Sequence, residues 1–249
     1  MKKIKKNRTI LVTGGSKGIG RSICIEFLKQ GEDVIFTYRK KDNSYNSLMK
    51  TQLNFKGEIL GVKCDSSEIY NLNQLKKFIK KKYKKIDVLV NNVGDAIKRT
   101  KFEKSKDKLW LDSIKLNLMS TVRTTKIFLE LLKKVKNSCI VNIGSIAGKN
   151  PSSGDSLHYA VTKSALATFT KGLAVELKGV RVNCVAPSVV DTNFQTRLSS
   201  KKRLKKIVKS TPLNRIGYPK DVSNMVVFLS SKKATFINGE TIYVAGGRQ

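Results

Sequence analysis

Short runs of apolar, often β-branched residues recur along the chain and predict the strands of a buried parallel sheet. Each run ends in glycine or polar residues, and most are followed by a segment whose apolar positions repeat with the period of a helix. The predicted strands are Thr9–Thr13, Asp33–Tyr38, Ile59–Asp65, Ile86–Val90, Cys139–Ile143, Val180–Val185 and Glu240–Val244. This alternation predicts an α/β fold with a doubly wound parallel sheet and helices on both faces.

Helical periodicity is clear in five segments and weak in one long connection. The predicted helices lie at Arg21–Leu28, around Leu72–Ile79, and at Asp107–Lys134, Tyr159–Leu177 and Asp221–Leu229. Residues 189–211 are polar, basic and weakly patterned, so we expect a mobile segment that covers the site. The chain has no repeat, linker or low-complexity tract, and residues 1–249 are therefore expected to form a single domain.

A glycine-rich turn follows the first predicted strand and precedes the first predicted helix. From Thr13 to Gly20 the chain reads T-G-G-S-K-G-I-G, so its glycines have the spacing G-x-x-x-G-x-G. Glycines let the backbone approach a pyrophosphate, and the helix N-terminus supplies amide donors and a favourable dipole. A plain tight turn is the alternative, but three glycines at a strand-to-helix junction favour an NAD(P)-binding domain of the Rossmann type.

The end of the second predicted strand bears on which dinucleotide is bound. An NAD site usually places a carboxylate there for the ribose hydroxyls, whereas the 2′-phosphate of NADP calls for cations. Here Tyr38 is followed by Arg39, Lys40 and Lys41, and Lys17 lies inside the glycine turn. The sequence therefore predicts NADP(H), although in so lysine-rich a chain some basic residues fall here by chance.

Polar residues mark three further positions. Asp65 follows the third predicted strand, where it would accept from an adenine amino group or cap a helix. The fourth strand ends in Asn91-Asn92-Val93-Gly94, at the sheet edge where open α/β sheets bind ligands. Asn117 interrupts an apolar stretch and is either a satisfied core amide or part of a proton path.

Tyr159 and Lys163 are the strongest candidates for chemistry. They are four residues apart at the start of a predicted helix, so both side chains project from one face. An ammonium group nearby favours the phenolate and lowers the tyrosine pKa towards neutrality, as acid–base catalysis requires. Ser145 ends the fifth predicted strand and is placed to hydrogen-bond a substrate carbonyl. The alternative, a pair on a helix surface, is common for this spacing when it occurs alone.

Composition excludes several classes of protein. No run of about 20 apolar residues is present that would span a membrane, and the apolar run after the basic N-terminus is too short for a signal peptide. The four cysteines are far apart and mostly flanked by apolar residues. This is typical of buried thiols in a reducing cytosol and not of a disulfide or zinc framework. We therefore expect a cytoplasmic protein without a metal site.

The net charge of +32 has two interpretations. One is binding to nucleic acid, an anionic membrane or an acidic protein. The other is a lysine-biased composition on solvated helix faces, which is favoured because lysine greatly outnumbers arginine and no basic groove interleaved with aromatic residues is visible. We therefore expect no specific nucleic acid and no membrane partner, but incidental, salt-dependent binding to polyanions.

Taken in order, these motifs resemble the classical short-chain dehydrogenase/reductases, from about Thr9 to Gly247. The resemblance implies that Tyr159 is the general acid and that Ser145 polarises the substrate carbonyl. It implies that Lys163 lowers the tyrosine pKa and binds the nicotinamide ribose, and that Asn117 holds a water of a proton relay. The implied cofactor contacts, besides Tyr159 and Lys163, are Gly14, Ser16, Lys17, Gly18, Ile19, Arg39, Asp65, Asn91, Gly94, Val185 and Thr192.

Within that family the chain is most similar to the bacterial 3-oxoacyl-[acyl-carrier-protein] reductases. The similarity lies in Pro212-Leu213-x-Arg215-x-Gly217, Phe236-Ile237-x-Gly239-Glu240-Thr241 and Gly246-Gly247. It implies an acidic acyl carrier protein as a partner, near Lys136 and Lys178, and a homotetramer paired through the helices at 107–134 and 159–177. The chain departs from these reductases at Val93, at Pro187-Ser188, in the loop between Ser145 and Tyr159, in the short connection Glu176–Gly179, and at its ending Gly247-Arg248-Gln249.

The leading hypothesis is therefore an NADPH-dependent reductase of a small-molecule or carrier-bound carbonyl, acting on 3-oxoacyl thioesters. A second hypothesis is an NADP-dependent dehydrogenase of a sugar, polyol or other small alcohol, which shares the same motifs. A third, from a different class, is a non-catalytic protein that uses the nucleotide fold as a scaffold and its charge to bind polyanions. Substrate specificity is expected in residues 149–157 and 189–211, where no sequence code is readable.

Overall fold

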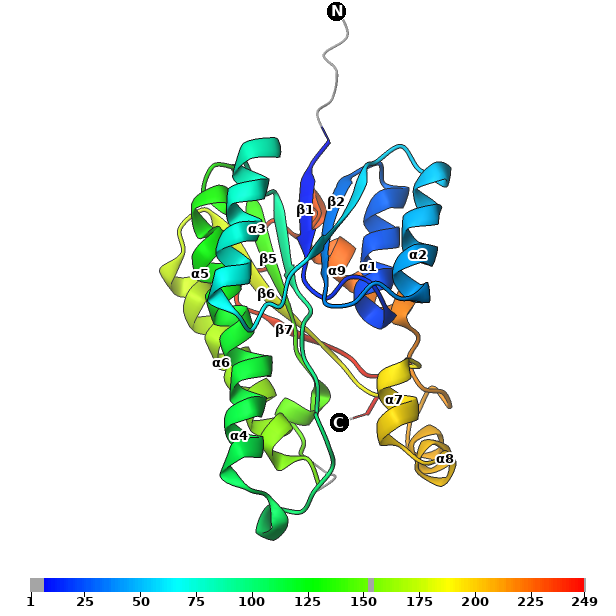
Figure 1. The fold of residues 1–249 in the computed structure, drawn as a ribbon. Helices are drawn as coiled ribbons and strands as arrows, with labels where there is room; N and C mark the ends of the chain where they lie inside the picture. Colours follow the sequence, from blue (N-terminus) through cyan, green and yellow to red (C-terminus); the bar gives the residue numbers. More distant parts are fainter. Residues whose placement is uncertain (1–6, 152–154, 249) are drawn as a thin grey trace, which may run out of the picture.

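The computed structural model describes residues 7–151 and 155–248, which form one α/β domain around a seven-stranded sheet (Figure 1). The strand order is β3-β2-β1-β4-β5-β6-β7, and every neighbouring pair is parallel. The strands are β1 (Thr9–Val12), β2 (Asp33–Tyr38), β3 (Ile59–Lys63), β4 (Val88–Asn91), β5 (Ser138–Ile143), β6 (Val180–Pro187) and β7 (Thr241–Val244). The predicted fold class is confirmed, and each predicted strand is present within two residues at either end.

Helices cover both faces of the sheet (Figure 1). On one face lie α1 (Gly18–Lys29) and α9 (Pro219–Leu229), which pack against each other, with α2 (Asn43–Lys50) beside them. On the other face lie α3 (Ile69–Lys82), α4 (Asp107–Ile114), α5 (Ser120–Leu132) and α6 (Leu157–Glu176). The sequence analysis did not predict α2, because its apolar positions are few.

Alternating side chains of the strands divide the core into two layers. Ile10 and Val12 pack on one face of the sheet with Phe27 of α1, whereas Leu11 packs on the other with Leu75 of α3. All four cysteines are buried and free, as predicted, and burial raises the pKa of Cys24 and Cys139. Burial on both faces explains why these strands are continuous apolar runs in the sequence.

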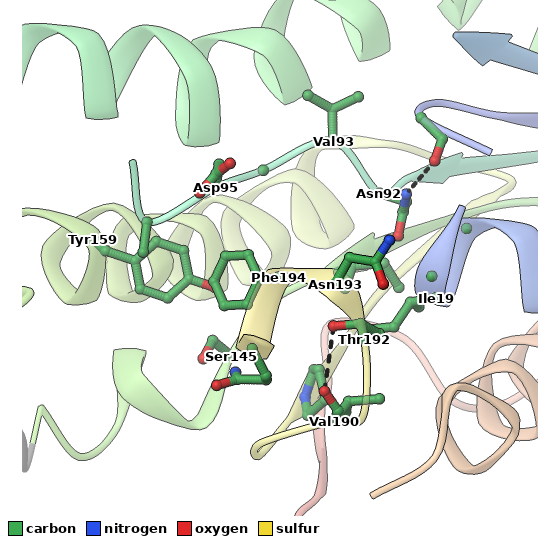
Figure 2. A pocket seen from close by; sticks show the side chains of 18 of the residues that line it. Ile19, Asn92, Val93, Asp95, Ser145, Tyr159, Val190, Thr192, Asn193 and Phe194 are labelled. Atoms are coloured by element: carbon green, nitrogen blue, oxygen red, sulfur yellow. Dashed lines mark hydrogen bonds between the residues drawn. The ribbon is translucent and has the colours of Figure 1, made fainter. Parts of the chain in front are cut away.

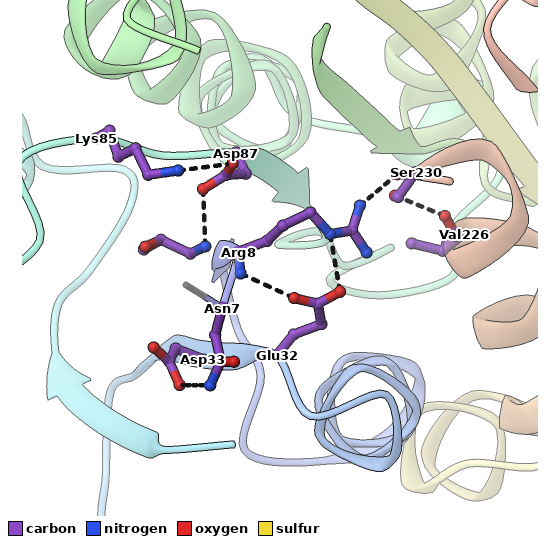
Figure 3. Close-up of polar contacts among 9 residues, drawn as sticks. Asn7, Arg8, Glu32, Asp33, Lys85, Asp87, Val226 and Ser230 are labelled. Carbon is purple, nitrogen blue, oxygen red and sulfur yellow. Dashed lines mark hydrogen bonds and ion pairs between the residues drawn. The ribbon is translucent and has the colours of Figure 1, made fainter. Parts of the chain in front are cut away.

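The amino-terminal edge of the sheet is closed by a polar network (Figure 3). The Arg8 guanidinium donates to Glu32 Oε1 at 2.8 Å and to the Ser230 carbonyl at 2.6 Å. The backbone N–H of Thr9 donates to Asp87 Oδ2 at 2.9 Å. These contacts join the start of β1 to the loops before β2 and β4 and to the end of α9, and they leave the opposite edge for binding.

The long predicted helix at 107–134 is interrupted near its centre. A π-helical turn, Lys115–Met119, separates α4 from α5, and the buried Asn117 is at its middle. Such single π turns in an α-helix frequently occur at functional sites. Among the described residues, no helix is both long enough and apolar enough to cross a membrane.

The 189–211 segment contains two helices that the sequence analysis did not predict. They are α7 (Asn193–Leu198) and α8 (Lys201–Lys209), and the Ser200 hydroxyl caps α8 by accepting from the Arg203 N–H at 3.2 Å. The apolar positions of α8 are only Leu204, Ile207 and Val208, so its pattern is weak although its helix is regular. Mobility of this segment stays a prediction.

Candidate active site

A cavity of about 1450 Å³ opens at the carboxyl edge of the sheet, where β1 and β4 diverge (Figure 2). Pockets for small organic ligands usually measure roughly 300–1,000 Å³, so this one has room for a dinucleotide together with a substrate. The predicted site residues that line it are Gly14, Ser16, Lys17, Gly18, Ile19, Arg39, Asp65, Gly94, Ser145, Tyr159, Lys163 and Thr192.

The glycine turn is shaped for a close-lying ligand. Gly14 and Gly18 have φ angles of +64° and +56°, which L side chains rarely adopt. A Cβ on Gly20 would lie 2.4 Å from the Gly14 carbonyl oxygen, so the helix could not start this close to the turn with a larger residue. No side chain caps the first amides of α1, which leaves them for an anion such as a pyrophosphate. This turn fits a dinucleotide.

Asn92 and Val93 hold the glycine turn against the end of β4. The Asn92 amide donates to the carbonyls of Thr13 and Gly14, both at 3.0 Å. The Thr13 hydroxyl accepts from the N–H groups of Asn92 and Val93 at 3.0 and 3.2 Å. Both Asn92 and Val93 line the cavity, whereas the sequence analysis had chosen their neighbours Asn91 and Gly94.

The nucleotide end of the cavity is basic. Arg39, Lys40 and Lys17 line it with exposed side chains, as cations that bind a 2′-phosphate would. Asp65 Oδ1 accepts from the N–H and hydroxyl of Ser67 at 2.9 and 2.7 Å, which closes the turn before α3. Burial alone would raise the pKa of Asp65, but these hydrogen bonds and the charge of Arg39 hold it below its ordinary value. The carboxylate therefore both closes a turn and faces the cavity.

Tyr159, Ser145 and Lys163 meet at the floor of the cavity. Tyr159 lies in the first turn of α6 and Ser145 follows β5, and both side chains line the cavity (Figure 2). Lys163 is one turn along α6, and its Nζ lies 5.7 Å from the centre of the Tyr159 ring. The same Nζ donates to the Ile143 carbonyl at 2.7 Å. The predicted convergence of these three side chains is therefore present.

The pKa values of this group differ from the expectation. Burial raises the pKa of Tyr159 to about 12, the nearby Ser145 hydroxyl offsets only part of this, and the Asp95 charge adds to it. Burial lowers the pKa of Lys163 to about 8, against a smaller opposing effect of Cys184. Lys163 thus does not lower the tyrosine pKa in this arrangement, because with a pKa of about 8 it loses its charge before the phenol titrates. Tyr159 keeps its proton at neutral pH, which suits a proton donor.

Asn117 is fully buried and does not line the cavity. Its Nδ2 donates to the carbonyls of Asp95 and Ser113 at 2.9 and 3.1 Å, and its Oδ1 accepts from the Asp95 N–H at 2.8 Å. The side chain therefore fixes the loop after β4 to the π turn. This matters for the catalytic group because a Cβ on Gly94 in that loop would lie 3.1 Å from Lys163 Nζ. The water relay at Asn117 stays a prediction.

Two other predicted contact residues also lie outside the lining. The Asn91 side chain is buried and donates to Thr125 Oγ1 at 3.1 Å and Asn142 Oδ1 at 2.9 Å, so it joins β4 to β5 and α5. Val185 is fully buried within β6, paired with Ile143. Pro187 at the end of β6 and Ser188 after it line the cavity instead.

Residues from the 189–211 segment cover the catalytic group. Phe194 of α7, which the sequence analysis missed, lies with its ring centre 6.4 Å from that of Tyr159 (Figure 2). Arg197 pairs with Asp95 at 2.5 Å, and Arg99 donates to the Leu198 carbonyl at 2.6 Å. Predicted substrate-contact residues in 149–157 fall partly on residues 152–154, which lie outside the described residues.

The family model described as enoyl-(acyl carrier protein) reductase matches residues 14–249. The chain belongs to the short-chain dehydrogenase/reductase family and is an oxidoreductase of that family.

Among its relatives, the chain is 38% identical to the 3-oxoacyl-[acyl-carrier-protein] reductase FabG of Buchnera aphidicola subsp. Schizaphis graminum, over 98% of each chain. It is 33% identical to FabG of Escherichia coli K12 over 97% of each chain. A solved structure described as a glucose/ribitol dehydrogenase of this family from Brucella melitensis superposes with a TM-score of 0.89 at 30% identity, over 99% of this chain and 98% of that one.

Proposed function

We propose that the protein is an NADPH-dependent reductase that converts the keto group of a 3-oxoacyl thioester, carried on an acyl carrier protein, to a hydroxyl. The observation that carries this proposal is the convergence of Tyr159, Ser145 and Lys163 beside a dinucleotide-sized cavity. Identities of 38% and 33%, over nearly the full length, to reductases named for 3-oxoacyl-[acyl-carrier-protein] substrates support the substrate class.

Ser145, Tyr159 and Lys163 have different roles in the proposed carbonyl reduction. A bound nicotinamide supplies the hydride for the carbonyl carbon. The Ser145 hydroxyl holds the carbonyl oxygen beside Tyr159, and Tyr159 donates its phenolic proton to that oxygen as negative charge develops there. Because a carbonyl oxygen that has received hydride is much more basic than the tyrosinate, a tyrosine pKa above neutrality does not oppose this transfer. Lys163 holds positive charge next to the tyrosinate that is left.

The preference for NADPH over NADH rests on the basic nucleotide end. Arg39 directly follows β2, where an NAD site would place a carboxylate, and Lys17 approaches from the glycine turn. Both side chains are exposed and line the cavity, which is the position a 2′-phosphate would require.

The partner and assembly follow from the same proposal. Lys136 and Lys178 are exposed in the loops that follow α5 and α6 and would contact an acidic carrier protein. We also propose a homotetramer paired through the 107–134 and 159–177 helices. Large apolar side chains on these helices face solvent in the single chain, among them Leu111 at 66% and Val175 at 84% exposure.

The test is to follow oxidation of NADPH by the purified protein with acetoacetyl-carrier thioester, beside NADH and a panel of sugars, polyols and ketones. Turnover with the thioester and a clear preference for NADPH are expected. Turnover of sugars or polyols alone would favour the second hypothesis, which is supported by the structural similarity to a glucose/ribitol dehydrogenase and to an aldohexose dehydrogenase from Thermoplasma acidophilum (TM-score 0.86). No turnover of any carbonyl compound would reject the proposed reaction.

A further inference from the structure

Basic side chains from the C-terminal part of the chain line one part of the cavity. Arg203 and Lys206 of α8 line this part together with Arg248 from the segment after β7. Arg203 and Lys206 are three residues apart on one face of α8, and both line the cavity together with Ser210, the residue after the helix. Arg248 belongs to the chain ending that differs from the bacterial reductases, and neither the glycine turn nor the catalytic group uses it.

Carboxylates compensate the arginines around this cluster only in part. Arg197 pairs with Asp95, and Arg99 and Arg203 share Asp155 at 2.7 and 3.3 Å. Since one carboxylate cannot balance two guanidinium groups, Asp155 leaves an excess of positive charge at Arg203. Among the residues that the structure describes, the Nε of Arg203 is buried and has no hydrogen-bond partner.

The positive charges of Lys206 and Arg248 are balanced even less by nearby carboxylates of the described residues. Within 7–151 and 155–248, neither side chain has a carboxylate oxygen within 4.0 Å, and Arg248 donates to the Ser188 hydroxyl at 3.2 Å. Asp191 is an exposed acidic residue of the cavity lining, and it forms no ion pair with Lys206 or Arg248 among the described residues. Burial and the charge of Arg203 lower the pKa of Arg248, which agrees with two like charges lying close together.

Close cations are costly unless an anion lies between them, and arginine cannot relieve the cost by losing its proton. A guanidinium presents a planar set of donors that matches phosphate oxygens, and lysine adds a point charge. The same cavity continues to Tyr159, so one ligand can place a carbonyl at the catalytic group and an anionic end against α8.

We propose that Arg203, Lys206 and Arg248 form a subsite for a phosphate group on the tail of the carbonyl substrate. This subsite is distinct from the basic end at Lys17 and Arg39, where the cofactor phosphate is expected. The inference rests on the proposed function only for the identity of the reacting carbonyl, since the subsite itself binds the tail. It assigns a specificity role to Arg248 and gives the 189–211 segment a contact with the substrate.

The test compares two substrates that differ by one phosphate, acetoacetyl-phosphopantetheine and acetoacetyl-pantetheine, at saturating NADPH. Arg248→Gln and Lys206→Gln should each raise the KM for the phosphorylated substrate roughly tenfold, the usual effect of losing one hydrogen bond to a charged group, with little change in kcat. Neither variant should change the kinetics with acetoacetyl-pantetheine. Lys202→Gln, which removes the same charge from an exposed position of α8 outside the cavity lining, is the matched control.

Equal losses on both substrates, no loss on the phosphorylated substrate, or the same loss in Lys202→Gln would overturn the subsite. Acetoacetyl-coenzyme A and acetoacetyl-carrier protein, run in parallel, distinguish a phosphate on a free cofactor from one on a protein-bound arm.

A second measurement separates the subsite from the reaction. Calorimetric binding of phosphopantetheine and pantetheine to the NADPH-saturated protein should show a preference for the phosphorylated compound that Arg248→Gln removes. If the wild-type protein turns over neither thioester but keeps this preference, the proposed function fails and the subsite stands. If it binds both compounds equally, the subsite is rejected whether or not the enzyme is active.

Discussion

At the scale of single residues, burial shifts the pKa values of Tyr159 and Lys163 in opposite directions. Burial disfavours the charged form of each, which raises the pKa of the phenol to about 12 and lowers that of the ammonium to about 8. Both groups therefore tend towards neutrality in this arrangement. The tyrosine therefore keeps its proton across the physiological range, and the lysine is the group of this pair that titrates near it.

Removing the Tyr159 hydroxyl should separate chemistry from binding. Tyr159→Phe keeps the ring beside Phe194 but removes the proton donor, so turnover should fall by roughly 10²-fold or more. NADPH affinity, measured by fluorescence titration, should stay close to that of the wild type because the glycine turn and Arg39 are unchanged. Loss of NADPH affinity with activity preserved would contradict the role of Tyr159.

Lys163 should leave a signature in the pH dependence of stability. Its folded-state pKa of about 8 lies below the ordinary 10.5, so between these pH values the unfolded chain binds a proton that the folded chain does not. The unfolding free energy should therefore rise with pH across this window, by at most about 3 kcal/mol from this group. Denaturant unfolding of the wild type and of Lys163→Met at several pH values isolates this contribution. The unfolding free energy of the wild type should increase relative to that of the variant as the pH rises. A difference that is constant with pH would contradict the lowered pKa.

Arg39 should discriminate between the two dinucleotides. Arg39→Gln removes a cation from the nucleotide end without changing the glycine turn, so the Kd for NADPH should increase roughly tenfold, as expected for a lost charged hydrogen bond. The Kd for NADH should stay within about twofold. Equal losses for both cofactors would mean that Arg39 acts on the fold of the pocket and not on a 2′-phosphate. Lys50→Gln, at the exposed end of α2 and outside the cavity lining, is the control.

At the scale of secondary structure, the π turn between α4 and α5 positions the catalytic group from outside it. The turn directs Asn117 at the loop after β4, where the amide pairs with both backbone groups of Asp95. That loop carries Gly94 against Lys163 and brings Asp95 to Arg197 of α7. Asn117, for which the sequence left open a core amide or a proton path, thus connects three elements of the site.

Asn117→Ala should loosen this connection. The N–H and C=O groups of Asp95 would lose their partner, which should reduce the unfolding free energy by about 2–3 kcal/mol and lower kcat, since Gly94 and Lys163 would no longer be fixed. Ser113→Ala removes a smaller set of contacts with the same amide and should cost about 1 kcal/mol. Thermal or denaturant unfolding, together with steady-state kinetics, measures both. Full stability and activity in Asn117→Ala would refute the connecting role.

At the scale of the whole molecule, the net charge of +32 is spread over solvated helix faces. Lys76 and Lys80 of α3 pair with Glu130 of α5 and hold the pKa of that carboxylate at about 2, while Lys82 pairs with Glu58. The remaining lysines of α3 have no acidic neighbours within ion-pair distance among the described residues. We expect such a surface to attract polyanions through its charge alone.

Binding to nucleic acid should therefore be weak, independent of sequence and sensitive to salt. If six to ten phosphates are contacted, affinity should fall roughly 10³-fold or more between about 50 and 200 mM salt. Fluorescence anisotropy with two labelled duplexes of unrelated sequence measures this. Tight binding at physiological salt, or a preferred sequence, would instead support the hypothesis that the chain is a polyanion-binding protein on a nucleotide-binding scaffold.

Much of the fold is determined by local sequence. Most strands are short apolar runs bounded by glycine or polar residues, and burial on both faces makes the central runs recognisable. The glycine turn and the Tyr159–Lys163 spacing are also local, because a backbone with positive φ and a shared helix face depend on neighbours within one turn.

Only the tertiary structure decided what each polar residue does. Asn91 and Asn92 are adjacent and chemically identical, yet the strand sends Asn91 into the core and leaves Asn92 against the glycine turn. The burial that reverses the expected tyrosine pKa comes from elements far apart in the chain, including α7. Arg203 and Arg248 face one cavity although 45 positions separate them in the numbering. No periodicity in the sequence predicts this proximity, because it results from the packing of α8 beside the segment after β7.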